Sequence, residues 1–150
     1  MILEVNGVRK EVDAADDAPL LYVLRNQLGL FGSRYGCGAG QCGACFVLVD
    51  GRPMASCDLP VSFAVGKKVV TVEGLGNGDL HPVQKALIAE QAAQCGYCMS
   101  GIAVSAAALL SRNPDPSEEE VRQALDKNLC RCGSHNRVIK AVLRAAKAMR

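Results

Sequence analysis

The chain has 150 residues, eight cysteines and a formal net charge of +2, from 17 basic and 15 acidic side chains. This balance gives no reason to expect binding to nucleic acid or to an anionic membrane. No run of 18 apolar residues predicts a transmembrane helix, and the N-terminus lacks the pattern of an export signal. We therefore expect a cytoplasmic chain, or one that reaches the membrane or the periplasm only through a partner subunit.

The first half of the chain is expected to form short strands around one helix. Asn6-Gly7 and Asp50-Gly51 favour tight turns between neighbouring strands, and the first pair tolerates positive φ at both positions. An aspartate at position 16 or 17 would cap the helix, with Pro19 in its first turn and Gly29 or Gly32 at its end. The predicted strands are 2–5, 8–12, 46–49, 52–56 and 69–72.

The second half is expected to be helical. Pro82 lies at the tolerated first position of one helix, and Ser117 with Glu120 forms a capping box at the start of another. The glycines of 74–78 mark a boundary, which predicts two domains, 1–76 and 77–150. The predicted helices are 82–93, 101–110, 117–127 and 137–149.

Four cysteines of the first half, spaced C-x4-C-x2-C-x11-C, predict one [2Fe–2S] centre. The first three match the plant-type spacing, and the glycines between them let the backbone wrap a compact cluster and point N–H groups at its sulfurs. A four-cysteine zinc site usually uses two C-x2–4-C pairs, so the spacing favours iron and sulfur over zinc. The set consists of Cys37, Cys42, Cys45 and Cys57.

The other four cysteines form a second set, spaced C-x2-C-x31-C-x-C. We expect one pair at a junction of two helices and the other before the last helix, where helix N-termini favour thiolates. Spacing alone leaves [2Fe–2S] and four-cysteine zinc open, whereas a thioredoxin-type pair needs a βαβ context that the sequence lacks. This set consists of Cys95, Cys98, Cys130 and Cys132.

Neither histidine is expected to be a metal ligand. His81 precedes a helix start, where capping or packing is the simpler role, and His135 is expected in a solvated loop. Rieske clusters need two histidines on one iron, and both sets are already complete with cysteine. No nucleophile–base pair and no phosphate loop is visible, so the chain alone is not expected to convert an organic substrate.

Four segments occur in the order found in a known family: Tyr35–Cys45, His81–Ala86, Gln94–Cys98 and Asn128–Gly133. Together they resemble the small iron–sulfur subunit of the molybdenum hydroxylases, the xanthine dehydrogenase/aldehyde oxidoreductase family, over essentially the whole chain. The resemblance implies a [2Fe–2S] cluster at both cysteine sets. It also implies an α+β fold, with an N-terminal plant-type ferredoxin-like β-grasp domain followed by a C-terminal four-helix domain.

The resemblance further implies an electron-transfer role. In that family a large partner subunit carries the molybdopterin, usually as the cytosine dinucleotide in bacteria, and hydroxylates an N-heteroaromatic ring or an aldehyde. Electrons then pass through the helical-domain cluster and the ferredoxin-like cluster to an acceptor. Gln94 matches the family's glutamine that hydrogen-bonds the pterin, and Cys95 and Cys132 lie in the same region.

One departure from the family pattern bears on the electron acceptor. Many relatives have Thr-Pro after the C-x2-C, whereas this chain has Met99-Ser100-Gly101. This feature is similar to the isoquinoline- and nicotinate-oxidising branch, in which a cytochrome c often replaces the FAD subunit as the electron acceptor. The alternative to a subunit role is a free-standing two-cluster ferredoxin that serves several redox partners.

Overall fold

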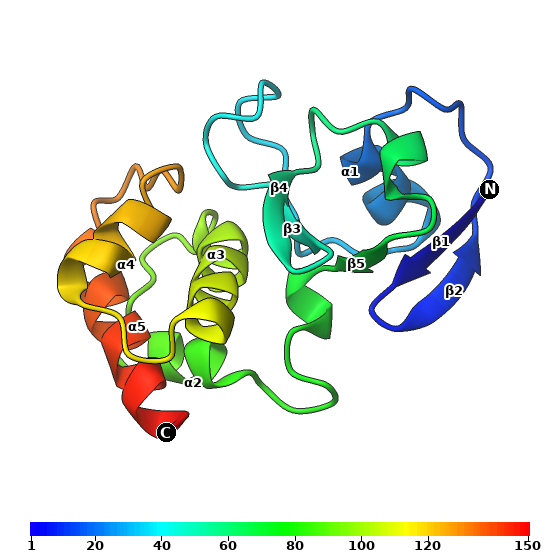
Figure 1. Ribbon diagram of the computed structural model, residues 1–150. Coiled ribbons are helices and arrows are strands. Elements are labelled where there is room, and N and C mark those ends of the chain that lie inside the picture. The colour runs from blue at the N-terminus through cyan, green and yellow to red at the C-terminus, as the bar shows by residue number, and fades with distance from the viewer.

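A five-stranded mixed sheet forms most of the first half of the chain (Figure 1). The computed structural model describes residues 1–150, and the strand order is β2-β1-β5-β3-β4. β1 and β5 pair in parallel, and the other neighbours pair antiparallel. Both predicted turns are confirmed, with positive φ at Asn6-Gly7 and Asp50-Gly51. The strands are β1 (Ile2–Val5), β2 (Val8–Glu11), β3 (Phe46–Val49), β4 (Arg52–Ala55) and β5 (Lys68–Val70).

The helix predicted after Pro19 is short and irregular. α1 (Leu20–Tyr22) continues directly into a π-helix, η1 (Val23–Gln27). The expected aspartate cap is wrong, because Pro19 itself is the N-cap and no side chain caps the helix. Instead, the Leu20 N–H donates to the Leu59 carbonyl at 2.8 Å. A neighbouring loop thus satisfies a donor that a helix start would otherwise leave free.

Aliphatic side chains from the sheet and from this helical segment form the first core. Alternate residues of β1 point inward, as the period of two in a strand requires. The short 3-10 helix η2 (Val61–Ala64) adds two more buried side chains to the same core. The largest fully buried members of this core are Leu3, Leu20, Leu24, Val47, Val61 and Val69.

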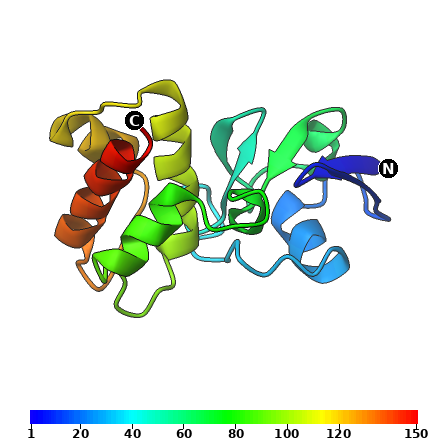
Figure 2. The ribbon, with the colours of Figure 1, turned by 90° about the horizontal axis from the view of Figure 1, so that it is seen from below.

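Four helices form the second half, which confirms the predicted α+β fold (Figure 2). α3 is buried along its length from Ser100 to Leu110, because it packs both in the second core and against β3 and β4. This placement explains why its sequence has no polar face. A 3-10 helix, η3 (Val72–Gly74), leads from the sheet to the helices, which are α2 (Pro82–Ala89), α3 (Met99–Arg112), α4 (Glu118–Ala124) and α5 (His135–Ala148).

α2 ends at Ala89 rather than at the predicted residue 93, because a Schellman motif closes it. Gln91 adopts a φ of +47°, and the Ala92 N–H donates to the Leu87 carbonyl at 2.9 Å. The residue after the helix therefore takes the left-handed conformation that usually calls for glycine. Because position 91 is glutamine rather than glycine, the sequence does not predict that α2 ends here.

Replacing Gln91 with glycine is expected to stabilise the chain by about 0.5 kcal/mol. The left-handed backbone costs a non-glycine residue roughly 1–2 kcal/mol, and the greater unfolded-state entropy of glycine offsets part of that gain. Denaturant unfolding of the cluster-loaded chain measures the difference. Lys140→Gly, on the exposed face of α5, is the control and should destabilise by about 1 kcal/mol. An unchanged or lower midpoint for Gln91→Gly would contradict the expectation.

His81 caps α2, in agreement with its predicted role. Its Nδ1 accepts a hydrogen bond from the Val83 N–H at 3.1 Å, and the Gln84 side chain accepts one from the His81 N–H at 2.8 Å. Burial lowers the pKa of His81 below its ordinary value of 6.5, because the charged form is poorly solvated there. A protonated Nδ1 also cannot accept the capping hydrogen bond.

The chain should therefore lose stability as the pH falls through about 6.5 toward the lower pKa of folded His81. In this range the unfolded chain binds the proton and the folded chain does not, so protonation favours unfolding. Denaturant midpoints at about pH 7.5 and about pH 6 test this expectation for the wild type and for His81→Asn, which keeps a cap without titrating. The same pH dependence in both proteins would contradict it.

Candidate metal centres

The glycine-rich loop before β3 curls around its cysteine sulfurs. The N–H groups of Ala39 and Gln41 point at the Cys37 Sγ at 3.4 and 3.2 Å, and the Cys37 N–H points at the Cys42 Sγ at 3.4 Å. The hydrogen bonds from Ala39 and Gln41 lower the pKa of the Cys37 thiol to about 6. One sulfur of the first set is therefore a thiolate near neutral pH, the form that binds metals.

Cys45 and Cys57 complete the first set at the end of the β3–β4 hairpin. Strand pairing brings them together, because one directly precedes β3 and the other closely follows β4. Both are buried against Leu21. Burial raises the pKa of the Cys45 thiol to about 12, so metal binding there must displace a proton.

The second set lies at two helix starts, as predicted. Cys98 is the N-cap of α3, and Cys130 and Cys132 lie in the loop before α5. The thiols meet in pairs, Cys98 with Cys130 and Cys95 with Cys132.

Local hydrogen bonds make the thiols of the second set unequal. Burial opposes ionisation of Cys130, but hydrogen bonds from Ser134, whose Oγ lies 3.1 Å from the Cys130 Sγ, lower the Cys130 pKa to about 6. Burial raises the pKa of Cys98 to about 12. The Tyr97 N–H, 3.5 Å from the Cys95 Sγ, lowers the pKa of Cys95. Each set thus contains a thiol with a pKa of about 6, whose thiolate form is the one that binds metals.

The two sets face each other across a cavity of about 440 Å³, lined by cysteines of both. The Leu129 N–H, from the second set's loop, donates to the Cys42 carbonyl at 3.0 Å. Arg34 donates to the Gly96 carbonyl at 2.8 Å and lies over the Tyr97 ring. Sequence reasoning missed all of these links, because hydrogen bonds between distant segments leave no periodic signal.

The residues of both sets fit [2Fe–2S] clusters. Four thiolates are the usual ligands of such a cluster, and N–H groups aimed at sulfur stabilise its reduced, more negative state. The loop around Cys37 supplies such N–H groups, and Tyr97 supplies one beside Cys95. A bound cluster would supply one-electron redox chemistry. The chain would contribute the thiolate ligands, the N–H dipoles aimed at sulfur, and side chains that partly exclude water from the cluster.

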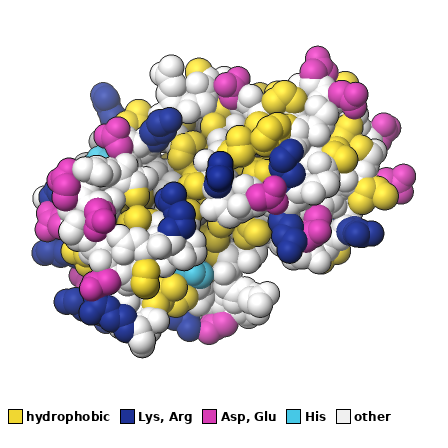
Figure 3. Space-filling view, viewed as in Figure 1, with side chains coloured by type: hydrophobic (Ala, Val, Ile, Leu, Met, Phe, Trp, Pro, Cys, Tyr) yellow, Lys and Arg dark blue, Asp and Glu magenta, His cyan; other side chains and the backbone are white.

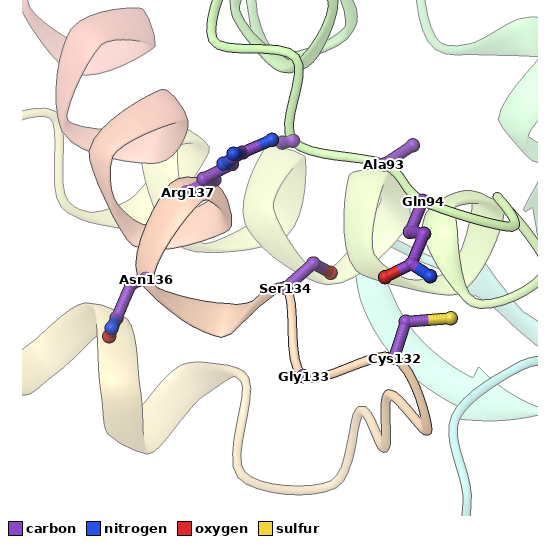
Figure 4. Close-up of a pocket in the computed structure, with 8 residues that line it drawn as sticks. Ala93, Gln94, Cys132, Gly133, Ser134, Asn136 and Arg137 are labelled. Carbon is purple, nitrogen blue, oxygen red and sulfur yellow. The ribbon is translucent and has the colours of Figure 1, made fainter.

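Gln94 lies beside the second set in a separate pocket of about 500 Å³ (Figure 4). Its side-chain amide points toward the Cys132 side chain, with Ser134 nearby and Arg137 on α5 further along the pocket. Gln94 is exposed, so its amide can bond a bound molecule. The structure thus brings Gln94 and a cysteine of the second set to one surface.

The exposed surface mixes charge with apolar patches. On the face shown in Figure 3, hydrophobic side chains gather across the middle, with several Lys and Arg side chains among them, and acidic groups lie mostly toward the edge. Tyr35, Tyr97 and Leu129 are exposed apolar residues beside the cysteines. Contiguous apolar surface of this kind marks contact sites for other molecules. None of the helices has the length and apolar character needed to cross a membrane.

Two family profiles match the chain, one over each cysteine set. The profile described as "2Fe-2S iron-sulfur cluster binding domain" matches residues 3–69, and "[2Fe-2S] binding domain" matches residues 71–143. The chain therefore carries two [2Fe–2S] clusters. The iron–sulfur interpretation of the second set is confirmed over zinc.

Similar proteins are components of oxidoreductases. One subunit of nicotinate dehydrogenase from Pseudomonas putida is 54% identical over 99% of this chain and 95% of its own length. The alpha subunit of isoquinoline 1-oxidoreductase from Brevundimonas diminuta is 49% identical over 90% of this chain and 89% of its own length.

Solved structures agree with this assignment. Quinoline 2-oxidoreductase from Pseudomonas putida 86 matches with a TM-score of 0.93 and 36% identity, over 99% of this chain and 93% of the matched chain. Aldehyde oxidoreductase from Desulfovibrio desulfuricans matches with a TM-score of 0.94 and 42% identity, over 99% of this chain but only 17% of the matched one. The chain therefore belongs to the small [2Fe–2S] subunits of the molybdenum hydroxylase family, and it is the electron-transfer part of a multi-subunit oxidoreductase.

Proposed function

We propose that each cysteine set ligates its own cluster within its own domain, 1–76 for the first and 77–150 for the second. Two separate apolar cores support this division. The assigned ligands are Cys37, Cys42, Cys45 and Cys57 for the first cluster, and Cys95, Cys98, Cys130 and Cys132 for the second.

In this proposal electrons enter the chain at the second cluster and leave from the first. The observation that carries the order is the pocket shared by Gln94 and Cys132, where the molybdopterin of a large partner subunit would contact the side chain next to a cluster ligand. Cys37 is exposed, which gives an acceptor access to the first set. The hydrogen bond from the Leu129 N–H to the Cys42 carbonyl links the two cysteine loops and gives electrons a short path from the second set to the first.

The proposed substrate is an N-heteroaromatic ring or an aldehyde, with the pterin present as the cytosine dinucleotide. The names of the nicotinate and isoquinoline relatives, together with Met99-Ser100-Gly101, favour the N-heteroaromatic class. Hydroxylation with oxygen from water releases two electrons and two protons, and the chain passes the electrons singly to a cytochrome c or an FAD subunit. Eight cysteines that serve as metal ligands rather than in disulfides favour a cytoplasmic site for the chain, or one at the membrane or in the periplasm reached through its partner.

Isolation of the native complex tests this proposal. The expected result is a large molybdenum-containing subunit that copurifies with the chain, and reduction of both clusters by an N-heterocycle or an aldehyde. A stable monomer that purifies without molybdenum would instead support a free-standing two-cluster ferredoxin.

Replacing Gln94 with alanine should slow the reduction of both clusters by substrate about tenfold in the intact complex, while cluster content stays unchanged. The loss of one hydrogen bond to the pterin, roughly 1.4 kcal/mol, corresponds to that factor. Rapid-mixing absorbance measures the rate. Gln123→Ala, an exposed amide on α4, is the control. A wild-type rate in Gln94→Ala would argue against the pterin contact.

A further inference from the structure

Asn128 is a buried amide without a hydrogen-bond partner for its side chain. It lies in the loop between α4 and α5, is 3% exposed, and neither its Oδ1 nor its Nδ2 is hydrogen-bonded. An unsatisfied buried polar group costs about 1–3 kcal/mol. Because the polypeptide supplies no hydrogen-bond partner for this amide, the partner must be ordered water or a bound group.

This amide belongs to the second cysteine set's loop but lies against the loop of the first set. A Cβ placed on Gly43 would be 2.6 Å from the Asn128 Nδ2 and 2.7 Å from the Lys127 carbonyl oxygen. The N–H of the following residue, Leu129, donates to the Cys42 carbonyl. Backbone contacts therefore fix Asn128 beside the Cys42–Gly43 peptide, between ligands of the first cluster.

Ordered water is the competing explanation for the free amide. Asn128 also borders a cavity of about 200 Å³, to which Arg122, Asp126 and His135 contribute polar groups. A water there would satisfy the amide without touching either cluster. The two explanations differ in what the amide contacts, since a hydrogen bond to a cluster sulfur stabilises the reduced cluster directly and a hydrogen bond to water in this cavity does not.

We propose that Asn128 is a positioning residue for the first cluster, with its Nδ2 group donating a hydrogen bond to a sulfur of that centre. The inference rests on the proposed ligand assignment. A donated N–H stabilises the reduced cluster and raises its potential. Asn128 lies only two positions before Cys130, a ligand of the second cluster, yet it tunes the potential of the first cluster. The potential of the first cluster therefore depends on how the helical half docks.

A redox titration of the full cluster-loaded chain, followed by electron paramagnetic resonance, tests the inference. Asn128→Leu keeps the approximate size and removes the amide. It should lower the midpoint potential of the first cluster by about 59 mV, a tenfold change in the equilibrium, and leave the second cluster close to its wild-type potential. Asn26→Leu, at an exposed position, is the matched control. Unchanged potentials, or equal shifts of both clusters, would overturn the inference.

A second measurement keeps the inference testable if Asn128→Leu does not fold. Wild-type chain labelled with 15N only at the asparagine side-chain amide should show nitrogen coupling to the reduced first cluster in pulsed resonance spectra, and Asn128→Asp should lose it. If the wild-type sample has its full iron content but lacks that coupling, the proposed role of Asn128 is overturned and the ligand assignment still stands. A sample with iron for only one cluster refutes the ligand assignment instead.

Discussion

Replacing Cys98 with alanine should reduce the iron content of the chain from four atoms to two, because each of its two clusters holds two irons. We also expect the helical half to lose stability by ~3 kcal/mol or more. The 150 residues are divided between two cores, and a half of about 75 residues gains only marginal stability from its core. A bound cluster then contributes to folding as structural metals do.

Iron analysis and thermal melting of the full chain, followed by circular dichroism, measure both effects. Cys57→Ala is the matched variant, because it removes a ligand of the first set and should spare the second cluster. The helical signal should melt early in Cys98→Ala and much less so in Cys57→Ala. An unchanged helical melting transition in Cys98→Ala would show that the cluster does not support the fold.

Replacing Gly101 with alanine should separate the two halves of the chain. A Cβ at Gly101 would collide with the Gly43 carbonyl of the first cysteine loop. The new Cβ is fixed to the backbone of the buried helix α3, and the Gly43 carbonyl is itself backbone, so neither group can move without shifting the main chain. We expect a cost of about 3 kcal/mol or more. We expect the two cores to stay folded while their contact opens, since each has its own apolar cluster.

Limited proteolysis within 71–80 and the magnetic interaction between the two reduced clusters report this opening. Cleavage should become faster and the interaction weaker in Gly101→Ala. Ser100→Ala, the neighbouring position on α3, should behave as wild type, because its buried hydroxyl has no hydrogen-bond partner to lose. Wild-type cleavage and interaction in Gly101→Ala would contradict the tight contact.

The features that the sequence predicts well are those set by residues close together in the chain. Asn6-Gly7 specifies its hairpin because positive φ is needed at two adjacent positions. The capping box of Ser117 and Glu120 forms as predicted, since both bonds lie within one helical turn. The cysteine spacings belong to the same class, because a loop must bring ligands a few residues apart onto one cluster.

The features that sequence reasoning missed depend either on contacts between distant segments or on a backbone conformation that is unusual for the residue concerned. The start of α1 is satisfied by the Leu59 carbonyl rather than by an aspartate side chain. The end of α2 is closed at Gln91, a non-glycine residue in the left-handed conformation. The placement of Asn128 against Gly43 depends on how the two halves dock. No periodicity or local motif in the chain encodes these arrangements.

The central claim is that the two cysteine sets hold two separate clusters, each with its own four ligands. Quantification of iron and acid-labile sulfide, combined with electron paramagnetic resonance of the reduced full chain, tests it most directly. Two [2Fe–2S] clusters predict four irons, four sulfides and two distinct signals, of which Cys57→Ala loses one and Cys98→Ala the other. A single signal, or zinc in place of iron at the second set, would contradict the claim.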